Sequence, residues 1–366
     1  MLEIVFTIYI ICFCLQIFYY LFFFSRITFF KANRSSNPSS EPVSVVICAK
    51  NEAANLRKNL PLILSQQYPD FEVVVVNDRS EDESLEVLND LCTQFQNLRV
   101  GDIQKENNEL NGKKNALDFG IRMAKNDKII LTDADCRPAS NLWLRAMADK
   151  ITDEKSIVLG YSPYLQESQL LNYFIRFETF YSGLQYLSFA LAGVPYMGTG
   201  RNLGYIRNTF SRNNFTAGHL YSGDDDLVIN ASATRFNTSI TLLPEAFIYS
   251  SPKKTWSGWA RQKYRHLSTA THYKKRHQLL LGLLHTSHIL FYISFIWLIM
   301  GGYGLALVFF LFLIRLIFQA TVFGGALIKM KEKGLIYYLP LLDVCFVIYM
   351  IIFAPAVFFN KNSGWH

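Results

Sequence analysis

The 366-residue sequence has few charged residues, and several common nucleotide-binding and metal-binding patterns are absent from it. Charged residues make up 18% of the chain, below the roughly 25% of an average soluble domain. No G-x-G-x-x-G or G-x-x-x-x-G-K-[ST] pattern occurs, which disfavours a dinucleotide site and a P-loop. The six cysteines lack zinc-ligand spacing, and we expect all six to be buried, unpaired apolar residues. The 51% of hydrophobic residues further argues against intrinsic disorder, a fibrous protein and a simple soluble enzyme.

The apolar residues are concentrated at the two ends of the chain. Residues 2–24 contain one charged residue, Glu3, and are long enough to cross a hydrocarbon core of about 30 Å. A cleaved signal peptide is the competing interpretation, but the basic start and small-residue cleavage site of such a peptide are missing. Three further apolar segments lie at about 279–300, 305–328 and 335–359. We therefore expect about four transmembrane helices, one N-terminal and about three C-terminal.

Lysine and arginine residues flank the apolar segments and predict their orientation. They are Arg26, Lys31 and Arg34 after the first segment, eight residues between Lys253 and Arg276 before the second, and Lys329, Lys331 and Lys333 after the third. If every segment spans, these groups share one side, which the positive-inside rule makes the cytoplasm. We therefore expect an integral protein of the inner (plasma) membrane, with residues 31–278 facing the cytoplasm. The net charge of +7 then reflects attraction to anionic lipid, and no nucleic-acid partner is expected.

Two ionisable residues, Arg315 and Asp343, fall within the apolar segments. Such residues usually face a bundle interior or a polar cavity. A structural pair, or snorkelling to the membrane surface, is the simpler interpretation, and a transport pathway is the alternative. Four apolar segments without a detectable internal repeat disfavour a transporter. The last segment also contains two prolines, so it is either a tilted span or a segment partly in the interface.

The part of the chain between the apolar ends has the pattern of an α/β domain. Apolar, β-branched runs predict buried strands at 43–49, 72–76 and 128–132. Amphipathic stretches predict helices at 52–67, 81–95 and 113–125. This alternation implies a mostly parallel sheet with helices on both faces, which binds its ligand beyond the carboxyl ends of the strands. The expected domains are an anchor (1–30), a linker (31–41), the α/β domain (42–250), an amphipathic interfacial segment (251–278) and a membrane region (279–366).

Local patterns add detail to two of the expected helices. In the helix at 81–95, Ser80 begins a capping-box pattern, and Leu85, Leu88, Cys92 and Phe95 would share the buried face. Residues 170–195 are rich in Phe, Tyr and Leu but too polar at first to span. They predict an interfacial helix that runs into a loop near an acceptor site.

Two carboxylates follow the last of the three predicted strands. Asp133 and Asp135 are separated by one residue, and positions i and i+2 of an extended chain point to the same side. Two carboxylates can hold a hard divalent cation, which leaves its remaining positions to water and substrate phosphates. A lone D-x-D also occurs as surface acids or helix caps. Its place directly after an apolar strand favours an Mg²⁺ or Mn²⁺ site.

Four segments occur in an order and at spacings that resemble the nucleotide-sugar half of the family 2 glycosyltransferases. They are VSVVICAKNEAANL, VVVVNDRSEDES, NGKKNAL and ILTDADCRP. Downstream, SGDDDL at 222–227 and QKYRH at 262–266 resemble the family's E-D-x-x-L and Q-x-x-R-W motifs, and GTGRNL at 198–203 resembles an acceptor-side segment. The resemblance covers about residues 42–270. With its membrane segments, the chain is similar to the branch that includes ceramide glucosyltransferase and the cellulose and hyaluronan synthases.

The resemblance implies a GT-A fold and a nucleotide-diphosphate sugar donor, a UDP-sugar before a GDP-sugar. It places the chain around Ala49 and Glu52 near the base and ribose, Asp78 at the nucleobase and Lys113 at the diphosphate. Asn77 replaces the first acid of the family's D-D-G-S pattern, which weakens the nucleobase assignment. Lys114 is the alternative to Lys113 at the diphosphate.

The same resemblance assigns the metal and the basic end of the site. Asp133 would face the ribose or the metal, and Asp135 would ligate the Mg²⁺ or Mn²⁺. Gln262 and Arg265 lie one helical turn apart, and Arg265 would bind the diphosphate. His266 replaces the family's Trp, which puts processive polymer synthesis in doubt.

The resemblance places the catalytic base in the run of three aspartates at 224–226. Asp224 occupies the register of the family's base, and Gly223 replaces the usual Glu, so Asp225 and then Asp226 remain substitutes. The implied function is inverting transfer of a sugar to a lipid, lipid-linked or glycan acceptor. The alternative is a catalytically inactive membrane scaffold that retains the fold, in which Asn77, Gly223 and His266 would be signs of decay.

Overall fold

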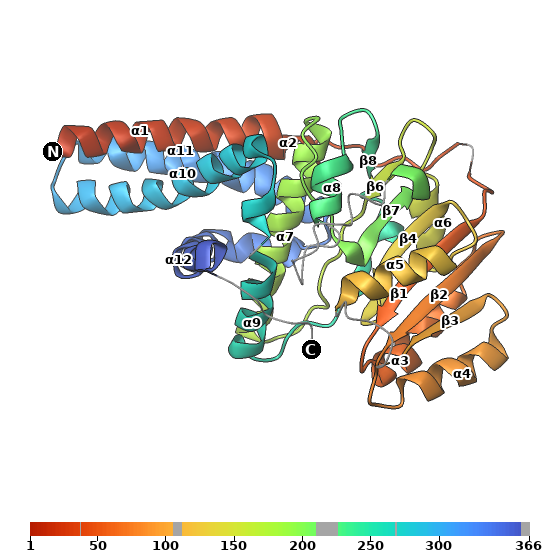
Figure 1. Cartoon of the computed structure of the whole chain (residues 1–366). Helices are drawn as coiled ribbons and strands as arrows, with labels where there is room; N and C mark the ends of the chain where they lie inside the picture. The colour runs from red at the N-terminus through yellow and green to blue at the C-terminus, as the bar shows by residue number, and fades with distance from the viewer. Residues whose placement is uncertain (37, 105–111, 210–225, 268, 360–366) are drawn as a thin grey trace.

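A seven-stranded sheet forms the centre of the domain that lies between the apolar ends of the chain (Figure 1). The computed structural model describes residues 1–36, 38–104, 112–209, 226–267 and 269–359. The strands, in the order β3-β2-β1-β4-β7-β6-β8, are β1 (Val43–Ala49), β2 (Phe71–Asp78), β3 (Leu98–Ile103), β4 (Lys128–Asp133), β6 (Ile157–Leu159), β7 (Leu203–Ile206) and β8 (Thr238–Ile240). All neighbouring pairs are parallel except those that β7 makes with β4 and β6. The expected mostly parallel α/β sheet is confirmed.

Alternate residues of the central strands belong to two different cores. Val43, Val45 and Ile47 of β1 pack with α3 (Ala53–Leu64), α4 (Ser84–Gln94) and α6 (Trp143–Ala148). Val46 and Cys48 face the other side, which α5 (Lys113–Met123) covers. A Cβ on Gly120 of α5 would lie 2.7 Å from Val46, so a glycine is needed where this helix crosses the sheet. Helices therefore cover both faces, as the alternation of strands and helices predicts.

The predicted start of the second helix is wrong, and its predicted buried face is confirmed only at Leu88 and, in part, at Phe95. α4 begins at Ser84, and Ser80 instead accepts a hydrogen bond from the backbone N–H of Asn51 at 3.0 Å. Asp82 accepts from the N–H groups of Ser84 and Ala53, which links this loop to the start of α3. The fully buried residues of α4 are Ser84, Val87, Leu88 and Leu91. A cap pattern cannot reveal such bonds because its partners lie in another loop.

The expected helix at 170–195 is α7 (Leu170–Leu191), and it connects the sheet to the apolar helices. Most of its residues are buried, and Figure 1 shows it between the sheet and the long helices. Toward the sheet, the Tyr186 hydroxyl donates to the carbonyl of Gly160 at 2.7 Å. Toward the long helices, Phe189 stacks on Phe23 with ring centres 4.2 Å apart. Contacts on both sides explain why the helix lacks a clear polar face.

Four helices in the described part of the chain are long and apolar enough to cross a membrane. The first comprises α1 (Leu2–Phe18), the π-helical η1 (Tyr19–Phe24) and α2 (Ser25–Thr28), and the next two are α10 (Lys275–Met300) and α11 (Leu305–Lys329). The fourth, Lys333–Ala354, comprises η7 (Lys333–Tyr338) and most of α12 (Leu339–Phe359). In Figure 1, α1, α10 and α11 run side by side away from the sheet, whereas α12 is seen nearly end on. Gly302 and Gly304 adopt positive φ in the tight turn between α10 and α11. The expected set of one N-terminal and three C-terminal helices is confirmed.

Arg315 and Asp343 form a buried ion pair between α11 and α12. Arg315 Nη1 lies 2.7 Å from Asp343 Oδ2, and both side chains are fully buried. The guanidinium also contacts Gln16, His288, Tyr292 and Gln319. This closed network agrees with the structural-pair interpretation of the two ionisable residues.

The cysteines differ in exposure more than expected. Cys12, Cys48 and Cys136 are buried, whereas Cys14 and Cys92 are exposed, and none of the six forms a disulfide in the described part of the chain. The prediction that all six would be buried is therefore wrong. Cys92 lies on the outer side of α4 because the buried face of this helix is rotated from the predicted one.

A second buried ion pair joins α7 to the turn after α11. Arg176 Nε donates to Glu332 Oε2 at 2.9 Å, and both side chains are almost fully buried. We expect Arg176→Met to lower the free energy of unfolding by about 3–5 kcal/mol, because it leaves a buried carboxylate without its partner. Thermal unfolding of the purified full-length protein measures this. Arg176→Met combined with Glu332→Gln should lose much less, and equal losses in both variants would contradict the explanation.

The same pair predicts a pH dependence. Burial raises the pKa of Glu332 from 4.5 to about 7, although Arg176 opposes the shift. The folded protein then binds more protons than the unfolded chain between these two values. The stability contributed by this carboxyl is therefore greatest below pH 4.5 and decreases as the pH rises to 7. The Arg176→Met penalty should accordingly be smaller in acid than above pH 7.

Candidate active site

Three neighbouring strands end at the same edge of the sheet and bring the predicted donor residues to it. β1 lies between β2 and β4, with Ala49 opposite Asn77 and Cys48 opposite Asp133. The chain turns sharply after β1 and β2, where Asn51 and Arg79 adopt positive φ. Positive φ is uncommon outside glycine, and strained residues of this kind cluster at functional sites. This edge is where a ligand of a parallel sheet is expected.

Asp133 and Asp135 form a compact oxygen-rich group beyond β4. One ligand atom from each of Asp133, Asp135 and Cys136 lies within 4.8 Å of the others. Burial, together with Asp135, raises the pKa of the Cys136 thiol, and its sulfur lies 3.2 Å from Ser250 Oγ. A protonated thiol is a poor ligand, whereas carboxylate oxygens suit hard cations. The two carboxylates therefore fit Mg²⁺ or Mn²⁺.

Lys113 contacts this carboxylate pair directly. Its Nζ lies 2.6 Å from Asp133 Oδ1. The residue begins α5, and Gly112 before it adopts φ 127° to make the turn into the helix. Because an ammonium has three donors, Lys113 can hold Asp133 and a phosphate oxygen together. The structure thus places a cationic side chain beside the Asp133–Asp135 carboxylates, where the resemblance places the diphosphate.

The acids at this edge repel one another. The pKa of Asp135 is raised by burial and by Asp133, while Arg201 opposes the shift. The pKa of Glu52 is also raised, chiefly by burial, with Asp135 and Asp133 contributing and Asn55 opposing. Like charges in a partly desolvated site favour a bound proton or a bound cation. Glu52 therefore lies close enough to Asp133 and Asp135 for the three carboxylates to influence one another's pKa values.

Arg201 is a site residue that the sequence reasoning did not single out. It lies in η2 (Gly200–Asn202), with its guanidinium 4.7 Å from the ring centre of Tyr164 and within 3.3 Å of Ser250 Oγ. The Tyr164 hydroxyl accepts from Gln262 Nε2 at 3.4 Å. Gln262 lies in α9 (Trp256–Leu267). Tyr164 therefore links the QKYRH motif to Arg201. In the sequence, the one hint of this role is that Arg201 is the single basic residue within GTGRNL.

Asp78 is buried at the end of β2 and keeps one oxygen available. Its Oδ1 accepts from Arg79 at 2.7 Å, whereas Oδ2 has no hydrogen-bond partner among the described residues. Asn77 donates to Asp102 at 2.8 Å, and its own carbonyl oxygen is likewise unsatisfied in that part of the chain. Buried acceptors without partners are rare and require an explanation. Two such oxygens fit the N–H groups of a nucleobase.

Three of the expected site residues, Ala49, Asp224 and Asp225, are not seen in their predicted roles. Ala49 is fully buried at the end of β1, its backbone included, so the structure leaves no atom of it open to a donor. Asp224 and Asp225 lie outside the described residues, as does the side chain of Arg265. Asp226 begins α8 (Asp226–Ser232) and accepts from Thr269 and Tyr273 at 2.6 and 2.7 Å. These bonds commit its buried carboxylate, which makes it a poor candidate for a base.

The comparison with known families agrees with this geometry. The sequence profile described as Glycosyl transferase family 2 matches residues 44–210, which include β1, β2, β4 and the Asp133–Asp135 pair. The chain contains a family 2 glycosyltransferase domain. The seven-stranded sheet and its donor edge are therefore parts of a GT-A fold.

Curated relatives of this glycosyltransferase domain match over part of their length. A probable glycosyltransferase, YdaM of Bacillus subtilis, is 27% identical over 232 residues, which is 61% of this chain and 54% of that protein. The beta-monoglucosyldiacylglycerol synthase of Trichormus variabilis is 28% identical over 107 residues, 29% of this chain and 22% of that protein. The chain thus spans about half the length of the first relative and less of the second.

A solved structure shares the fold of the glycosyltransferase domain and the adjoining helices. It is the mannosyltransferase PcManGT from Pyrobaculum calidifontis in complex with GDP-Man and Mn²⁺, with a TM-score of 0.61 and 17% sequence identity. The superposition covers 95% of this chain and 99% of that one. At this level of identity, the likeness establishes the fold.

Proposed function

We propose that the protein is an inverting glycosyltransferase. It moves a sugar from a nucleotide-diphosphate sugar to a lipid, lipid-linked or glycan acceptor. The observation that carries the proposal is the group at the end of β4, where Asp133 and Asp135 lie together with Lys113 bonded to Asp133. An inactive scaffold would not need to keep this group, nor the unsatisfied oxygens at the end of β2.

In the proposed reaction, the residues divide into donor-holding and proton-accepting roles. The Asn77 and Asp78 oxygens receive the nucleobase, while Lys113 donates to the diphosphate. A bound Mg²⁺ or Mn²⁺ on Asp133 and Asp135 would offset the charge that grows on the leaving diphosphate. Asp224, with Asp225 as the substitute, removes the acceptor hydroxyl proton as its oxygen attacks the anomeric carbon. Attack opposite the leaving group inverts the configuration at that carbon.

The proposed donor and acceptor classes draw on the sequence resemblance, with partial support from two of the matched proteins. PcManGT was solved in complex with GDP-Man, and the T. variabilis relative is named as the synthase of a lipid, beta-monoglucosyldiacylglycerol. We propose a UDP-sugar first and a GDP-sugar second as donor, and a lipid acceptor before a glycan. His266 in place of the usual Trp favours single transfer over polymer synthesis.

We further propose that the four long helices lie in the inner (plasma) membrane, with the glycosyltransferase domain on the cytoplasmic side. The positive charges that flank the helices support this orientation. α9 supports a position at the membrane surface, because Trp256 and Tyr264 are exposed while Trp259 packs against Phe353 of α12. The proposal places the protein in the membrane-bound branch of the family.

Nucleotide-sugar binding tests the proposed function. Purified full-length protein should bind at least one member of a panel of UDP- and GDP-sugars when Mg²⁺ or Mn²⁺ is present. Chelation with EDTA should remove the binding, as calorimetry can show. Failure of every nucleotide sugar to bind, with a folded protein, would support the inactive scaffold.

The exposed Cys92 provides a test of orientation. A membrane-impermeant maleimide should label it in inside-out vesicles and leave it unlabelled in right-side-out vesicles, because the glycosyltransferase domain faces the cytoplasm. Mass spectrometry of the α4 peptide measures the labelling, and Cys92→Ser provides the background. Labelling of this peptide in intact right-side-out vesicles would reverse the proposed orientation.

A further inference from the structure

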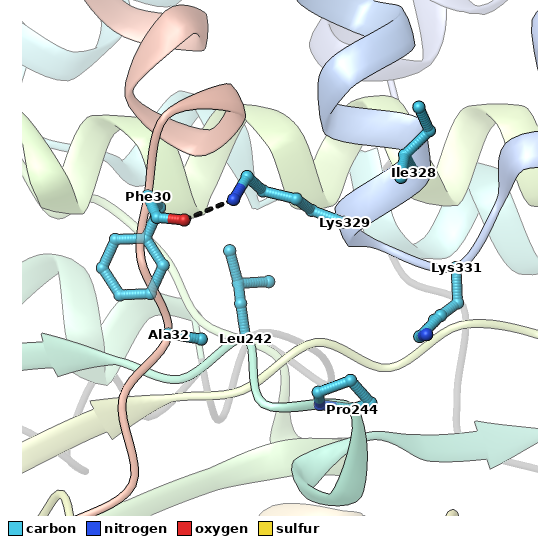
Figure 2. A pocket seen from close by; sticks show the side chains of 7 residues that line it. All are labelled: Phe30, Ala32, Leu242, Pro244, Ile328, Lys329 and Lys331. Carbon is cyan, nitrogen blue, oxygen red and sulfur yellow. Dashed lines mark hydrogen bonds between the residues drawn. The ribbon is translucent and has the colours of Figure 1, made fainter.

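A cavity lies where two of the long helices meet the glycosyltransferase domain (Figure 2). Its volume is about 200 Å³, against about 30 Å³ for a water molecule in the liquid, so a phosphate group fits. Phe30 and Ala32 line it from the chain after α2, Lys329 and Lys331 from the end of α11, and Leu242 from the loop after β8. A second cavity of about 170 Å³ shares Phe30, Ala32 and Leu242 with it. The two cavities adjoin each other at these shared residues and are together termed the cleft.

The cleft is strongly basic. Its described lining includes four lysines, two in each cavity, and no acidic residue: Lys329, Lys331, Lys31 and Lys150. Lys329 donates to the Phe30 carbonyl, and Lys150 donates to the Asn33 carbonyl at 2.8 Å, which fixes both ammonium groups at the cleft. Each ammonium has three donors, of which the carbonyl takes one. The cleft therefore suits an anion.

Three acids lie next to lining residues in the sequence: Asp149, Glu332 and Glu245. Asp149 Oδ1 accepts from the backbone N–H of Ser39 at 2.8 Å, and Glu332 pairs with Arg176. Glu245 follows the lining residue Pro244 in η5 (Pro244–Ala246). Arg34 binds its Oε1 at 2.7 Å, so a separate cation already pairs this carboxylate. In the described part of the chain no ion pair joins these acids to the four lysines, so the cleft keeps a net positive charge.

Lys331 occupies a backbone position that normally belongs to glycine. Its φ is 61°, in the left-handed region. The Glu332 N–H donates to Leu327 O at 2.7 Å and the Lys331 N–H donates to Ile328 O, which is the Schellman pattern at the end of a helix. Glycine is usual at this position because it has no Cβ to strain. A lysine kept here at a backbone cost, at the edge of a basic cleft, points to a use for its side chain.

The cleft lies at the depth where the long helices end. α11 ends at Lys329, and the first long helix ends at Thr28. Ile328 lines the cleft and is 58% exposed, and Phe29, which is 76% exposed, directly precedes the lining residue Phe30. In the membrane orientation proposed above, this is the level of the lipid headgroups on the cytoplasmic side. Lysines at that level meet phosphates, and the apolar side chains meet acyl chains.

We propose that this cleft binds the phosphate of an anionic phospholipid. Lys329 and Lys331 hold the phosphate, and the acyl chains extend past Ile328 and Phe29. A soluble phosphate would use the lysines but leave the exposed apolar side chains in water. None of the described donor-site residues lines this cleft, so we expect it to act on the retention of lipid and not on donor binding.

Lys331→Gly is a suitable test because it removes the ammonium group and relieves the backbone at the same position. Full-length protein in detergent would be titrated with phosphatidylglycerol or phosphatidylcholine, and bound lipid counted by native mass spectrometry. Wild type should prefer phosphatidylglycerol. Lys331→Gly should weaken its binding about five-fold, the equivalent of about 1 kcal/mol for one lysine near an anionic surface. Its melting temperature should stay the same or rise.

Lys333→Ala provides the matched control. It removes the same charge two residues further on, from an exposed side chain that does not line the cleft. It should leave phosphatidylglycerol binding unchanged. Equal effects of both substitutions, or none from Lys331→Gly, would overturn the site.

Inorganic phosphate separates the two possible sources of the anion. It should not displace phosphatidylglycerol at millimolar concentration. If phosphate alone stabilises wild type but not Lys331→Gly, and phosphatidylglycerol does not, the cleft takes a soluble anion and the lipid assignment fails. Donor binding should be the same in wild type and Lys331→Gly, so this result is independent of the proposed function.

Discussion

Asp135→Asn is expected to abolish metal-dependent binding of the nucleotide sugar and to lower turnover by about 10²–10³-fold. The substitution removes one of the two carboxylates that lie within ligand distance of each other at the end of β4. An amide oxygen is a weaker ligand and carries no charge to balance a divalent cation. Donor binding with and without Mn²⁺, measured by calorimetry, checks the result.

Asp127→Asn is the matched control for this substitution. Asp127 precedes β4 at the opposite end of the strand and is 76% exposed, with Arg207 at 3.6 Å. It should keep normal metal-dependent binding and turnover. If Asp135→Asn binds donor and turns over like wild type, the metal assignment is wrong, whatever the control shows.

Asp224→Asn has the second large expected effect. It should lower kcat by about 10²–10⁴-fold while leaving donor affinity unchanged, because the carboxylate acts on the acceptor proton and not on the nucleotide. Steady-state transfer rates and donor titration measure the two quantities separately. Loss of donor affinity together with kcat would contradict the role of base.

Two neighbouring acids make this prediction specific. Asp225→Asn is expected to keep most activity, and a larger loss there than at Asp224 would move the base to Asp225. Asp226→Asn should act on stability, since its carboxylate accepts from Thr269 and Tyr273. A lower melting temperature with near-normal kcat would identify Asp226 as a structural residue.

The central strands could be predicted from the sequence because their residues contact the core on both faces. The run at 43–49 is apolar except for Ser44 and forms β1 with all seven residues buried. The Asp133–Asp135 pair could be predicted for the same reason, since its place follows directly from the end of β4. A buried parallel strand leaves a strong local signal that needs no knowledge of distant contacts.

Features that depend on contacts between distant segments could not be predicted in this way. α4 begins late because Ser80 and Asp82 bind backbone groups of the loop after β1. Arg201 joins the site only because the fold stacks it on Tyr164, which in turn binds Gln262. The Arg176–Glu332 pair joins residues 156 positions apart. Periodicity and motif spacing carry no information about such pairings.

Transfer of labelled sugar in isolated membranes tests the central claim most directly. Membranes that contain wild-type protein would be incubated with radiolabelled UDP- and GDP-sugars and Mn²⁺, and the product would be extracted and its mass measured. We predict label in a new sugar-bearing product with wild type, and none with Asp135→Asn or Asp224→Asn. Membranes with folded wild-type protein that form no such product, or form it equally well with both variants, would contradict the assignment of this chain as a glycosyltransferase.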